Sequence, residues 1–368
     1  MKRSETMMRK WVSAVMTLVA CVALLAGCGV ATHTEPQSSG ESEITTAPSG
    51  KGETRQATPE TSMSAGELET TTVSPLHVEG TKLLDSAGKT MQLRGVSTHG
   101  IAWYPQYVNA DLFENLKRDW GINAVRIAMY CAESGGYCTD GNKEQLKKTV
   151  RDGIDAAVKN DMYVIVDWHT LSDNDPNMHV DEAKEFFGEI ANEYADVPNV
   201  LYEICNEPNG GTTWAQVKRY AEQVIPVVRA RAKDAVVLVG TPNWCQDIEA
   251  VTADPLSVDN VMHTVHFYAA DHGQWLRDKV VAAIKAGTPV FVSEFGATAA
   301  NGDGGVDVKS ADAWLDMLDR YDVSYIIWNM SDKHEGSALF ATNEARDPIE
   351  SDLSDEGQWY RQYLREHR

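Results

Sequence analysis

Two glutamates follow strand-like runs and stand in short polar motifs that suggest chemistry. Glu207 lies in YEICNEPNG, the stretch Tyr202–Gly210, and Glu294 lies in VFVSEFG. When two carboxyl groups approach each other, their like charges raise the pKa of one of them. One group can then donate a proton while the other stays ionised and attacks as a nucleophile. Each motif alone also fits a strand that runs into a turn, so the surrounding elements must decide.

Eight strand-like runs alternate with helix-like segments over residues 75–368. The runs are QLRGVST, NAVRIAMY, MYVIVDWH, NVLYEIC, AVVLVG, VMHTVHFY, PVFVSEFG and SYIIWNM. This alternation predicts an α/β fold, a single (β/α)8 TIM barrel, with a short N-terminal β-hairpin whose turn we place at Asp85–Gly88. A doubly wound open sheet is the alternative, but no GxGxxG phosphate loop follows any of these runs.

The predicted strands end in charged, amide and aromatic residues, whereas their interiors are mostly Val, Ile, Leu and Ala. The strand-end residues are, in chain order, His99, Arg126–Tyr130, Asp167–His169, Asn206–Glu207, His266–Tyr268, Glu294 and Trp328–Asn329. Function in such a barrel lies at the carboxyl ends of the strands. Glu207 and Glu294 end the fourth and seventh strands, which face each other, so we expect both in one cleft. Carboxyl groups about 5 to 5.5 Å apart are what retaining glycoside hydrolysis requires.

From Pro75 to His367 the chain resembles glycoside hydrolase family 5, the cellulase-type members of the retaining barrel enzymes. The resemblance rests on seven motifs in the order of that family: LRGVSTHG, NAVRIAMY, VIVDWH, YEICNEPNG, HFYAADHGQ, VSEFG and IIWNMSDK. It is closest to bacterial endo-1,4-β-glucanases. It implies a cofactor-free hydrolase that cleaves internal β-1,4 bonds of cellulose or related β-glucans. A mannanase, a xyloglucanase and a mixed-linkage glucanase share the same carboxylate pair and stay open.

The resemblance also implies a role for each matching residue. Glu207 matches the acid/base and Glu294 the nucleophile. The other residues of the reacting centre are Asn206, which would bind the sugar 2-hydroxyl, Arg126 and Tyr268, which would hold Glu294, and His266, which would sit beside both carboxylates. The reacting-sugar subsite would be lined by His99, Tyr130 and His169, with Trp328 as its floor.

Further sugar contacts are expected from aromatic residues at loop and strand ends, because the C–H faces of a β-linked glucan pack on aromatic rings. These residues are Trp103, Tyr104, Trp244 and Trp328. Each of them alone would be read as ordinary packing. Lys333 and Glu335, just past the last strand, match polar sugar contacts in the family, although solvated loop charges are the alternative.

Two other classes of protein are weighed against this interpretation. A metal-dependent barrel hydrolase could use Asp167–His169 together with His263 and His266. However, side chains three residues apart on a strand point to opposite faces unless a bulge intervenes, so we expect no metal. A noncatalytic sugar-binding barrel would need the aromatic residues, but it would have no use for two opposed glutamates.

The N-terminal 74 residues differ from the rest in composition. Residues 1–28 join a basic start to an apolar run that ends in Leu25–Cys28, LAGC, which resembles the lipobox of bacterial lipoproteins. We expect cleavage before Cys28, lipidation on it, and export to a membrane-anchored position; an uncleaved transmembrane anchor is the alternative. Residues 29–74 are rich in Ser, Thr, Glu and Pro and predict a disordered linker.

The overall charge limits the classes of partner, and the cysteine spacing limits the possible metal and disulfide sites. Net charge is −21, so nucleic-acid binding is not expected. The resemblance implies a β-glucan as the partner, and we expect a monomer. Four cysteines follow the lipobox, and no CxxC pair for structural zinc is present. Cys131 and Cys138 bracket a short glycine-containing loop, where a disulfide suits an exported protein and two free thiols are the alternative.

Overall fold

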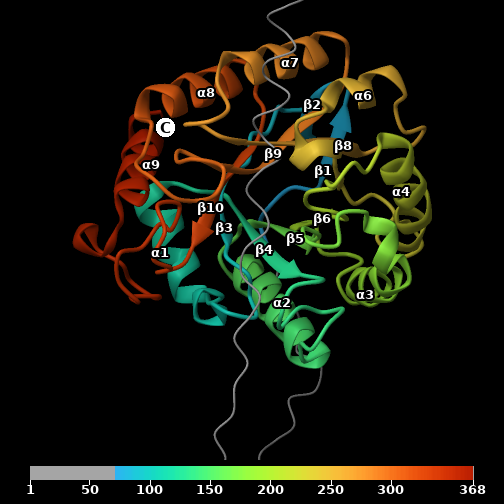
Figure 1. Cartoon of the computed structure of the whole chain (residues 1–368). Coiled ribbons are helices and arrows are strands. Elements are labelled where there is room, and N and C mark those ends of the chain that lie inside the picture. The colour runs from blue at the N-terminus through green and yellow to red at the C-terminus, as the bar shows by residue number, and fades with distance from the viewer. Residues whose placement is uncertain (1–70, 368) are drawn as a thin grey trace, which may run out of the picture. The chain divides into compact units, whose positions relative to one another are not determined.

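The computed structural model describes residues 71–367, shown in colour in Figure 1. In that range eight parallel strands close into a barrel, which confirms the predicted (β/α)8 architecture. Neighbouring strands pair in the order β10-β3-β4-β5-β6-β7-β8-β9. Their bounds are β3 (Arg94–Thr98), β4 (Ala124–Tyr130), β5 (Tyr163–His169), β6 (Val200–Glu203), β7 (Val237–Gly240), β8 (Val261–Tyr268), β9 (Val290–Gly296) and β10 (Tyr325–Met330).

Helices between the strands surround the barrel, as Figure 1 shows. The α-helices are α1 (Ala110–Trp120), α2 (Lys143–Lys159), α3 (Val180–Glu193), α4 (Trp214–Arg229), α5 (Pro242–Cys245), α6 (Ile248–Ala253), α7 (Gln274–Lys285), α8 (Val308–Arg320) and α9 (Asp355–Glu366). Short 3-10 helices are η1 (Pro105–Tyr107), η2 (Pro176–His179) and η3 (Glu350–Asp352).

Helix α1 illustrates how local sequence sets these elements. The Asn109 side chain accepts a hydrogen bond from the Leu112 N–H and so caps the first turn. Gly121 ends the helix with φ of 81°, a left-handed conformation that favours glycine. One face of the helix is apolar and buried, at Leu112, Phe113, Leu116 and Trp120. The same face anchors the helix against the barrel.

The strands divide their side chains between two environments, because successive residues point to opposite faces. On β4, Val125, Ile127 and Met129 belong to the large core between strands and helices. The alternate residues Arg126 and Tyr130 are also buried, but they belong to the barrel interior that leads to the site. Alternation on a single strand therefore separates packing residues from functional ones.

The predicted N-terminal hairpin is present, but its turn lies elsewhere than expected. Strands β1 (Leu76–Glu79) and β2 (Lys82–Asp85) pair antiparallel around Gly80, which has φ of 59°. The expected turn at Asp85–Gly88 also forms, with the Gly88 N–H bonded to the Asp85 carbonyl at 2.9 Å. It connects β2 only to an isolated bridge between Leu84 and Thr90. The apolar side of the hairpin packs with residues at the amino ends of the barrel strands.

Residues just before the expected domain boundary at Pro75 contact the barrel. The Thr72 N–H donates to the Asp161 carboxylate at 2.6 Å, and Asn199 donates to the Thr71 hydroxyl at 3.1 Å. The end of the predicted linker, residues 71–74, is therefore part of the described fold. The signal segment, the lipobox and the rest of the linker lie outside the described residues. Among residues 71–367, no helix combines the length and the apolar character needed to cross a membrane.

Candidate active site

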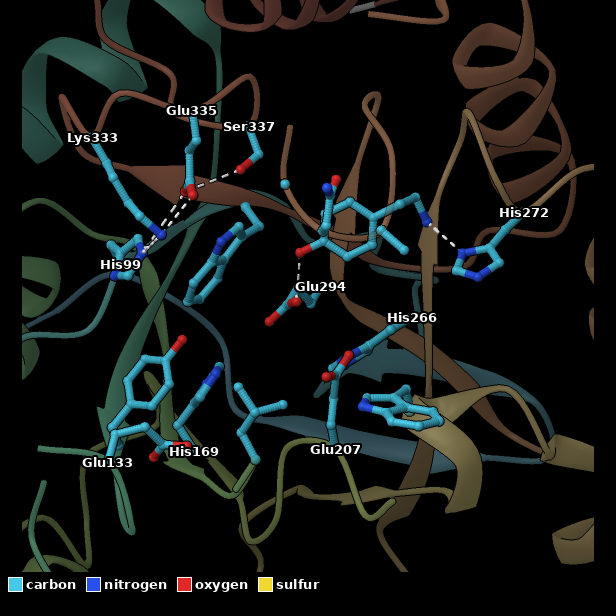
Figure 2. Close-up of a pocket in the computed structure, with 18 of the residues that line it drawn as sticks. His99, Glu133, His169, Glu207, His266, His272, Glu294, Lys333, Glu335 and Ser337 are labelled. Atoms are coloured by element: carbon cyan, nitrogen blue, oxygen red, sulfur yellow. Dashed lines mark hydrogen bonds and ion pairs between the residues drawn. The ribbon is translucent and has the colours of Figure 1, made fainter. Parts of the chain in front are cut away.

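A cleft of about 550 Å³ lies at the carboxyl ends of the barrel strands. Figure 2 shows Glu294 near its middle, with Glu207 and His266 on one side and His99 and Lys333 on the other. Most of the predicted site residues line this cleft: His99, Trp103, Tyr130, His169, Glu207, Trp244, His266, Tyr268, Glu294, Trp328, Lys333 and Glu335. The residues were predicted from eight separate segments, and the barrel brings them together.

Two predicted residues of the reacting centre, Arg126 and Asn206, lie buried beneath the cleft rather than on its wall. Tyr104, also predicted as a sugar contact, is partly exposed and lies beside the lining rather than in it. Its ring packs against His99, with centroids 5.0 Å apart. Its place as a sugar contact therefore stays a prediction.

The two glutamates approach each other closely. Glu294 lies within β9, whereas Glu207 lies in the turn that follows β6. One oxygen of each carboxyl group and one ring nitrogen of His266 all lie within 4.8 Å of one another. The separation suits a pair in which one group attacks while the other exchanges a proton with the leaving oxygen.

Arg126 organises the floor of the cleft. Its Nη1 donates to Glu294 Oε2 at 3.2 Å, and its Nε donates to Glu203 Oε2 at 2.7 Å. Its Nη2 donates to Asn206 Oδ1 at 2.7 Å and pairs with Asp167 Oδ2 at 3.0 Å. The guanidinium is fully buried, and charge-assisted bonds in a dry environment are strong. It therefore holds the nucleophile candidate in one orientation.

The sequence interpretation missed one member of this network. Glu203 was read only as part of a strand, although it is fully buried and paired with Arg126. A charged residue inside an otherwise apolar run, VLYE, is the signal that could have identified it. Asp167 was considered only as a strand-end residue and metal ligand. It accepts a hydrogen bond from His169 Nδ1 at 2.6 Å and so orients that ring toward Asn206.

The two glutamates have different electrostatic surroundings. Burial raises the pKa of Glu207 to about 7, with Arg126 opposing and Glu203 adding to the shift. Burial and the charge of Glu207 raise the pKa of Glu294, while His266 and Arg126 lower it. In addition, Glu294 Oε1 accepts a hydrogen bond from the Tyr268 hydroxyl at 2.9 Å. With these donors around it, Glu294 is the better stabilised anion, and Glu207 is suited to hold a proton.

Aromatic rings form the walls where a sugar chain would lie. Trp328 packs between His99 and His169, with ring centroids 5.1 and 5.2 Å away. Trp103 and Trp244 keep 40% and 45% of their surface exposed, which is unusual for so large an apolar side chain. Exposed rings that line a polar cleft are suited to stack on sugars.

Polar residues close the His99 side of the cleft. Lys333 Nζ pairs with Glu335 Oε2 at 2.6 Å, and Glu335 Oε1 accepts hydrogen bonds from Asn329 and Ser337. Both Lys333 and Glu335 line the cleft, as predicted. They are therefore oriented groups rather than free loop charges.

Trp244 is presented by an unusual turn. Asn243, Trp244 and Cys245 have φ of 59°, 53° and 58°, although none is glycine. The Trp244 N–H donates to the Pro208 carbonyl at 3.1 Å, and the Cys245 thiol donates to the Asn206 carbonyl at 2.9 Å. These bonds tie the turn to the segment that carries Glu207.

The cysteine prediction is corrected by the structure, in which Cys131 and Cys138 are free thiols. Their backbones do lie side by side, since the Cys138 N–H donates to the Cys131 carbonyl at 2.9 Å. The Cys131 side chain turns into the apolar core, where its sulfur faces the Met129 carbonyl at 3.9 Å. Short spacing in the loop thus did not lead to a bridge.

The ligand set considered for a metal does not assemble. A register shift in β8 lies between Thr264 and His266, which is the kind of irregularity that could have placed both histidines on one face. His263 nevertheless packs against Trp214, with ring centroids 5.6 Å apart, and it does not line the cleft. Within residues 71–367, the group of metal-ligand types that comes close enough for an ion is Glu207, His266 and Glu294. It contains both the acid and the nucleophile candidates.

A closed parallel barrel with paired, unequally stabilised glutamates in an aromatic cleft defines a glycoside hydrolase of the barrel type. The sequence model of one family, Cellulase (glycosyl hydrolase family 5), matches residues 84–334. This chain belongs to that family, and it is a glycoside hydrolase.

Several bacterial endoglucanases are similar to this chain. The chain is 49% identical over 289 residues to Endoglucanase A of Butyrivibrio fibrisolvens, covering 77% of this chain and 67% of that protein. It is 44% identical over 287 residues to an endoglucanase of Clostridium saccharobutylicum, covering 77% of this chain and 63% of that protein. It is 45% identical over 283 residues to Endoglucanase A of Evansella cellulosilytica, covering 76% of this chain and 57% of that protein. The chain thus spans less than two thirds of the last two relatives.

Solved structures agree with this assignment. Cellulase Cel5C_n is 41% identical with a TM-score of 0.76, covering 79% of this chain and 91% of that one. A variant of the catalytic domain of Thermobifida fusca endoglucanase Cel5A, solved in complex with cellotetraose, is 38% identical with a TM-score of 0.75. It covers 79% of this chain and 97% of that chain.

Proposed function

We propose that this chain is a retaining endo-1,4-β-glucanase that hydrolyses internal bonds of cellulose or related β-glucans by double displacement. Glu294 is the nucleophile and Glu207 is the acid/base. One observation carries the proposal: the two adjacent carboxyl groups have different hydrogen-bond donors and charges around them. Arg126 and Tyr268 donate to Glu294. Within residues 71–367, no lysine or arginine pairs with Glu207, and its pKa is raised to about 7.

In the first step, a Glu294 oxygen attacks the anomeric carbon while Glu207 gives its proton to the departing glycosidic oxygen. The negative charge on Glu294 is consumed as the covalent bond forms. In the second step, the Glu207 carboxylate takes a proton from water, which attacks the same carbon from the opposite side and releases Glu294. The proton lost in the first step is regained in the second, and the sugar keeps its configuration.

The assignment of the two glutamates is tested with substitutions and azide. Glu294→Ala should abolish turnover of every β-glucoside, because no glycosyl-enzyme can form. Glu207→Ala should still react quickly with an aryl glycoside whose leaving group departs without protonation, and should then accumulate the intermediate. Azide should release it as the β-glycosyl azide, whereas Glu294→Ala should give the α-azide. Early-time NMR of wild-type product should show retention.

Two results would contradict the assignment. Inverted product from the wild-type protein would exclude double displacement. A β-azide from Glu294→Ala would mean that the two roles are reversed.

The cleft and the relatives support the proposed substrate class. An open cleft flanked by exposed tryptophans accommodates a chain that continues past the reacting bond on both sides, as endo-cleavage requires. The relatives are named endoglucanases, and the Thermobifida fusca structure holds cellotetraose. Side-by-side assays on carboxymethylcellulose, mixed-linkage glucan, xyloglucan and mannan distinguish a glucanase from the mannanase and xyloglucanase alternatives. Preference for mannan would overturn the substrate proposal while leaving the two-glutamate mechanism intact.

Trp244 should contribute to the binding of long substrates. Trp244→Ala should lower kcat/KM on cellohexaose by about fivefold, since stacking on an aromatic face is worth about 1 kcal/mol. Trp275 is the matched control, because it is 47% exposed but is not among the described residues that line the cleft. Trp275→Ala should therefore have little effect. Equal losses in both variants would show that Trp244 is not a sugar platform.

A further inference from the structure

A continuous row of hydrogen bonds links Glu207 to the buried Glu203. Glu207 Oε1 lies 2.9 Å from His266 Nδ1, and His266 Nε2 lies 2.9 Å from Ser293 Oγ. Ser293 Oγ lies 2.6 Å from Glu203 Oε1, and the other oxygen of Glu203 accepts from Arg126 Nε at 2.7 Å. His266, Ser293 and Glu203 are buried below the cleft. The mechanism above uses Glu207 but gives Glu203 no role.

The hydrogens of this row must all point the same way. A neutral imidazole has one N–H, and a serine has one O–H, so each can donate in only one direction along the row. If they point toward Glu203, then Ser293 donates to Glu203, His266 Nε2–H donates to Ser293, and Nδ1 is left as an acceptor. Glu207 must then carry a proton to complete the row. If they point the other way, Glu203 is protonated and Glu207 is a carboxylate.

The position of Arg126 decides between the two directions. Its guanidinium is in contact with Glu203, where it stabilises a carboxylate, whereas no ion pair joins it to Glu207 among the described residues. We propose that Glu203, acting through Ser293, fixes His266 as the Nε2–H tautomer and so keeps the proton on Glu207 in the resting enzyme. Glu203 is a positioning residue, since it does not line the cleft. The inference rests on the proposed role of Glu207 as acid/base.

The charges around the row are consistent with this direction. Burial lowers the pKa of His266 to about 4, so the ring is neutral near pH 7 and carries one N–H. Burial raises the pKa of Glu203, but Arg126 opposes that shift through direct contact. Other titratable groups face the row from neighbouring segments, namely Glu294 on β9, Tyr268 on β8, Asp167 and His169 on β5, and Cys245 on α5.

The same tautomer serves both halves of the reaction. When Glu207 gives its proton to the leaving oxygen, it becomes a carboxylate that faces the lone pair of His266 Nδ1 instead of an N–H. This arrangement destabilises the anion, so Glu207 readily takes a proton from the attacking water in the second step. His266, Ser293 and Glu203 keep their hydrogens throughout. No proton is gained or lost over the cycle.

Glu203→Gln is the sharpest test, because Arg126 determines how the new amide must lie. Arg126 Nε donates toward this side chain, so the amide oxygen has to face Arg126 and the NH2 group has to face Ser293. Ser293 then accepts from the amide and donates to His266 Nε2. The row is reversed, and His266 Nδ1–H donates to an ionised Glu207.

The direct readout is the tautomer of His266 in the free protein, measured by 15N NMR of labelled histidine and assigned by loss of the signal in His266→Ala. Wild type should show Nε2–H, and Glu203→Gln should show Nδ1–H. Asp167→Asn is the matched control, because Asp167 is a buried carboxylate that also pairs with Arg126 but lies outside the row. It should keep Nε2–H.

Kinetics give a second readout. Glu203→Gln should lower kcat/KM on cellotetraose by about 100-fold, a typical contribution of a general acid. On 2,4-dinitrophenyl β-cellobioside, which needs no protonation of its leaving group, the loss should stay below about tenfold. The alkaline limb of the cellotetraose pH profile should also move to lower pH. Equal losses on both substrates would indicate general damage and would overturn the proposal.

Three tautomer results would also overturn it. The first is an Nδ1–H tautomer of His266 in the wild-type protein, which can be measured even if the variant does not fold. The second is an unchanged Nε2–H tautomer in Glu203→Gln. The third is an Nδ1–H tautomer in Asp167→Asn. The last result would show that any loss of buried negative charge switches the ring. Because the tautomer is measured without substrate, this test is independent of the retention and azide experiments. Those experiments alone decide whether the proposed mechanism holds.

Discussion

At the scale of single residues, the site depends on how a small number of donors is shared among several buried carboxyl groups. Asp167, Glu203 and Glu294 each contact Arg126. Glu207 instead contacts a neutral histidine. Buried charges without a partner are costly. Glu207, which has no ion pair with Arg126 among the described residues, is therefore suited to keep its proton. Chemistry at this site is therefore a consequence of the geometry around one guanidinium.

This distribution predicts a pH dependence. An ordinary glutamate has a pKa of about 4.3, and burial raises the pKa of Glu207 to about 7. The raised pKa means that the acid form persists up to about that pH and is lost above it. The value of kcat/KM on cellotetraose should therefore fall as pH rises above about 7. A substrate with a dinitrophenolate leaving group should lack this alkaline limb, and an identical limb on both substrates would contradict the assignment to Glu207.

At the scale of elements, the short helix α5 links the exposed Trp244 to the segment that carries Glu207. Three consecutive residues with positive φ cost of order 1–3 kcal/mol each, so surrounding contacts must hold them in place. The Cys245 thiol provides such a contact through the Asn206 carbonyl and also lies 3.2 Å from the Thr264 hydroxyl. One buried sulfur thus connects the Trp244 turn, the Glu207 segment and β8.

Loss of the Cys245 thiol should be measurable in stability. Cys245→Ala leaves the buried Asn206 carbonyl without this donor and should lower the free energy of unfolding by about 1–3 kcal/mol. Chemical denaturation measures the change. Cys245→Ser is the control, because its hydroxyl can still donate, and it should retain most of the stability. Similar stability in Cys245→Ala and wild type would mean that the thiol contact does not hold the turn.

At the scale of the whole molecule, the enzyme is an acidic barrel preceded by a segment of different composition. Net charge of −21 disfavours polyanionic partners and is compatible with a neutral polysaccharide. We propose that the chain is exported and anchored by lipid on Cys28, on the basis of the LAGC motif. A single acyl chain binds membranes only weakly, so stable anchoring requires more than one.

The anchor is tested on protein expressed in a bacterial host. Intact mass should show a mature chain that begins at a lipid-modified Cys28, and detergent phase separation should place it with membranes. Cys28→Ala, which keeps the apolar run, should abolish both the added mass and the modification-dependent partitioning. An unmodified N-terminus downstream of Cys28 in the wild-type protein would refute the proposal.

Much of the architecture could be predicted because its signals are local. Strand-like runs, helical spacing and the order of motifs predicted the eight-stranded barrel and both glutamates, and the barrel rule then placed the strand-end residues together. Errors arose where two local signals competed. Turn residues occur at both Gly80 and Gly88, and only the pairing of Leu76–Glu79 with Lys82–Asp85 shows which turn closes the hairpin. Likewise, the spacing of Cys131 and Cys138 allowed a bridge, but core packing set the direction of the sulfur.

The sequence by itself determined which residue types are available at the strand ends, because strand and turn propensities act over a few neighbours. Only the tertiary structure decided how they share hydrogens and charge. Glu203, Arg126 and Ser293 come from β6, β4 and β9, and none is near another in the chain. Their contacts form when the barrel closes and excludes water. Burial strengthens each hydrogen bond and ion pair, because water no longer competes for the donors. The same closure holds Trp244 in a backbone conformation that its own sequence would not favour.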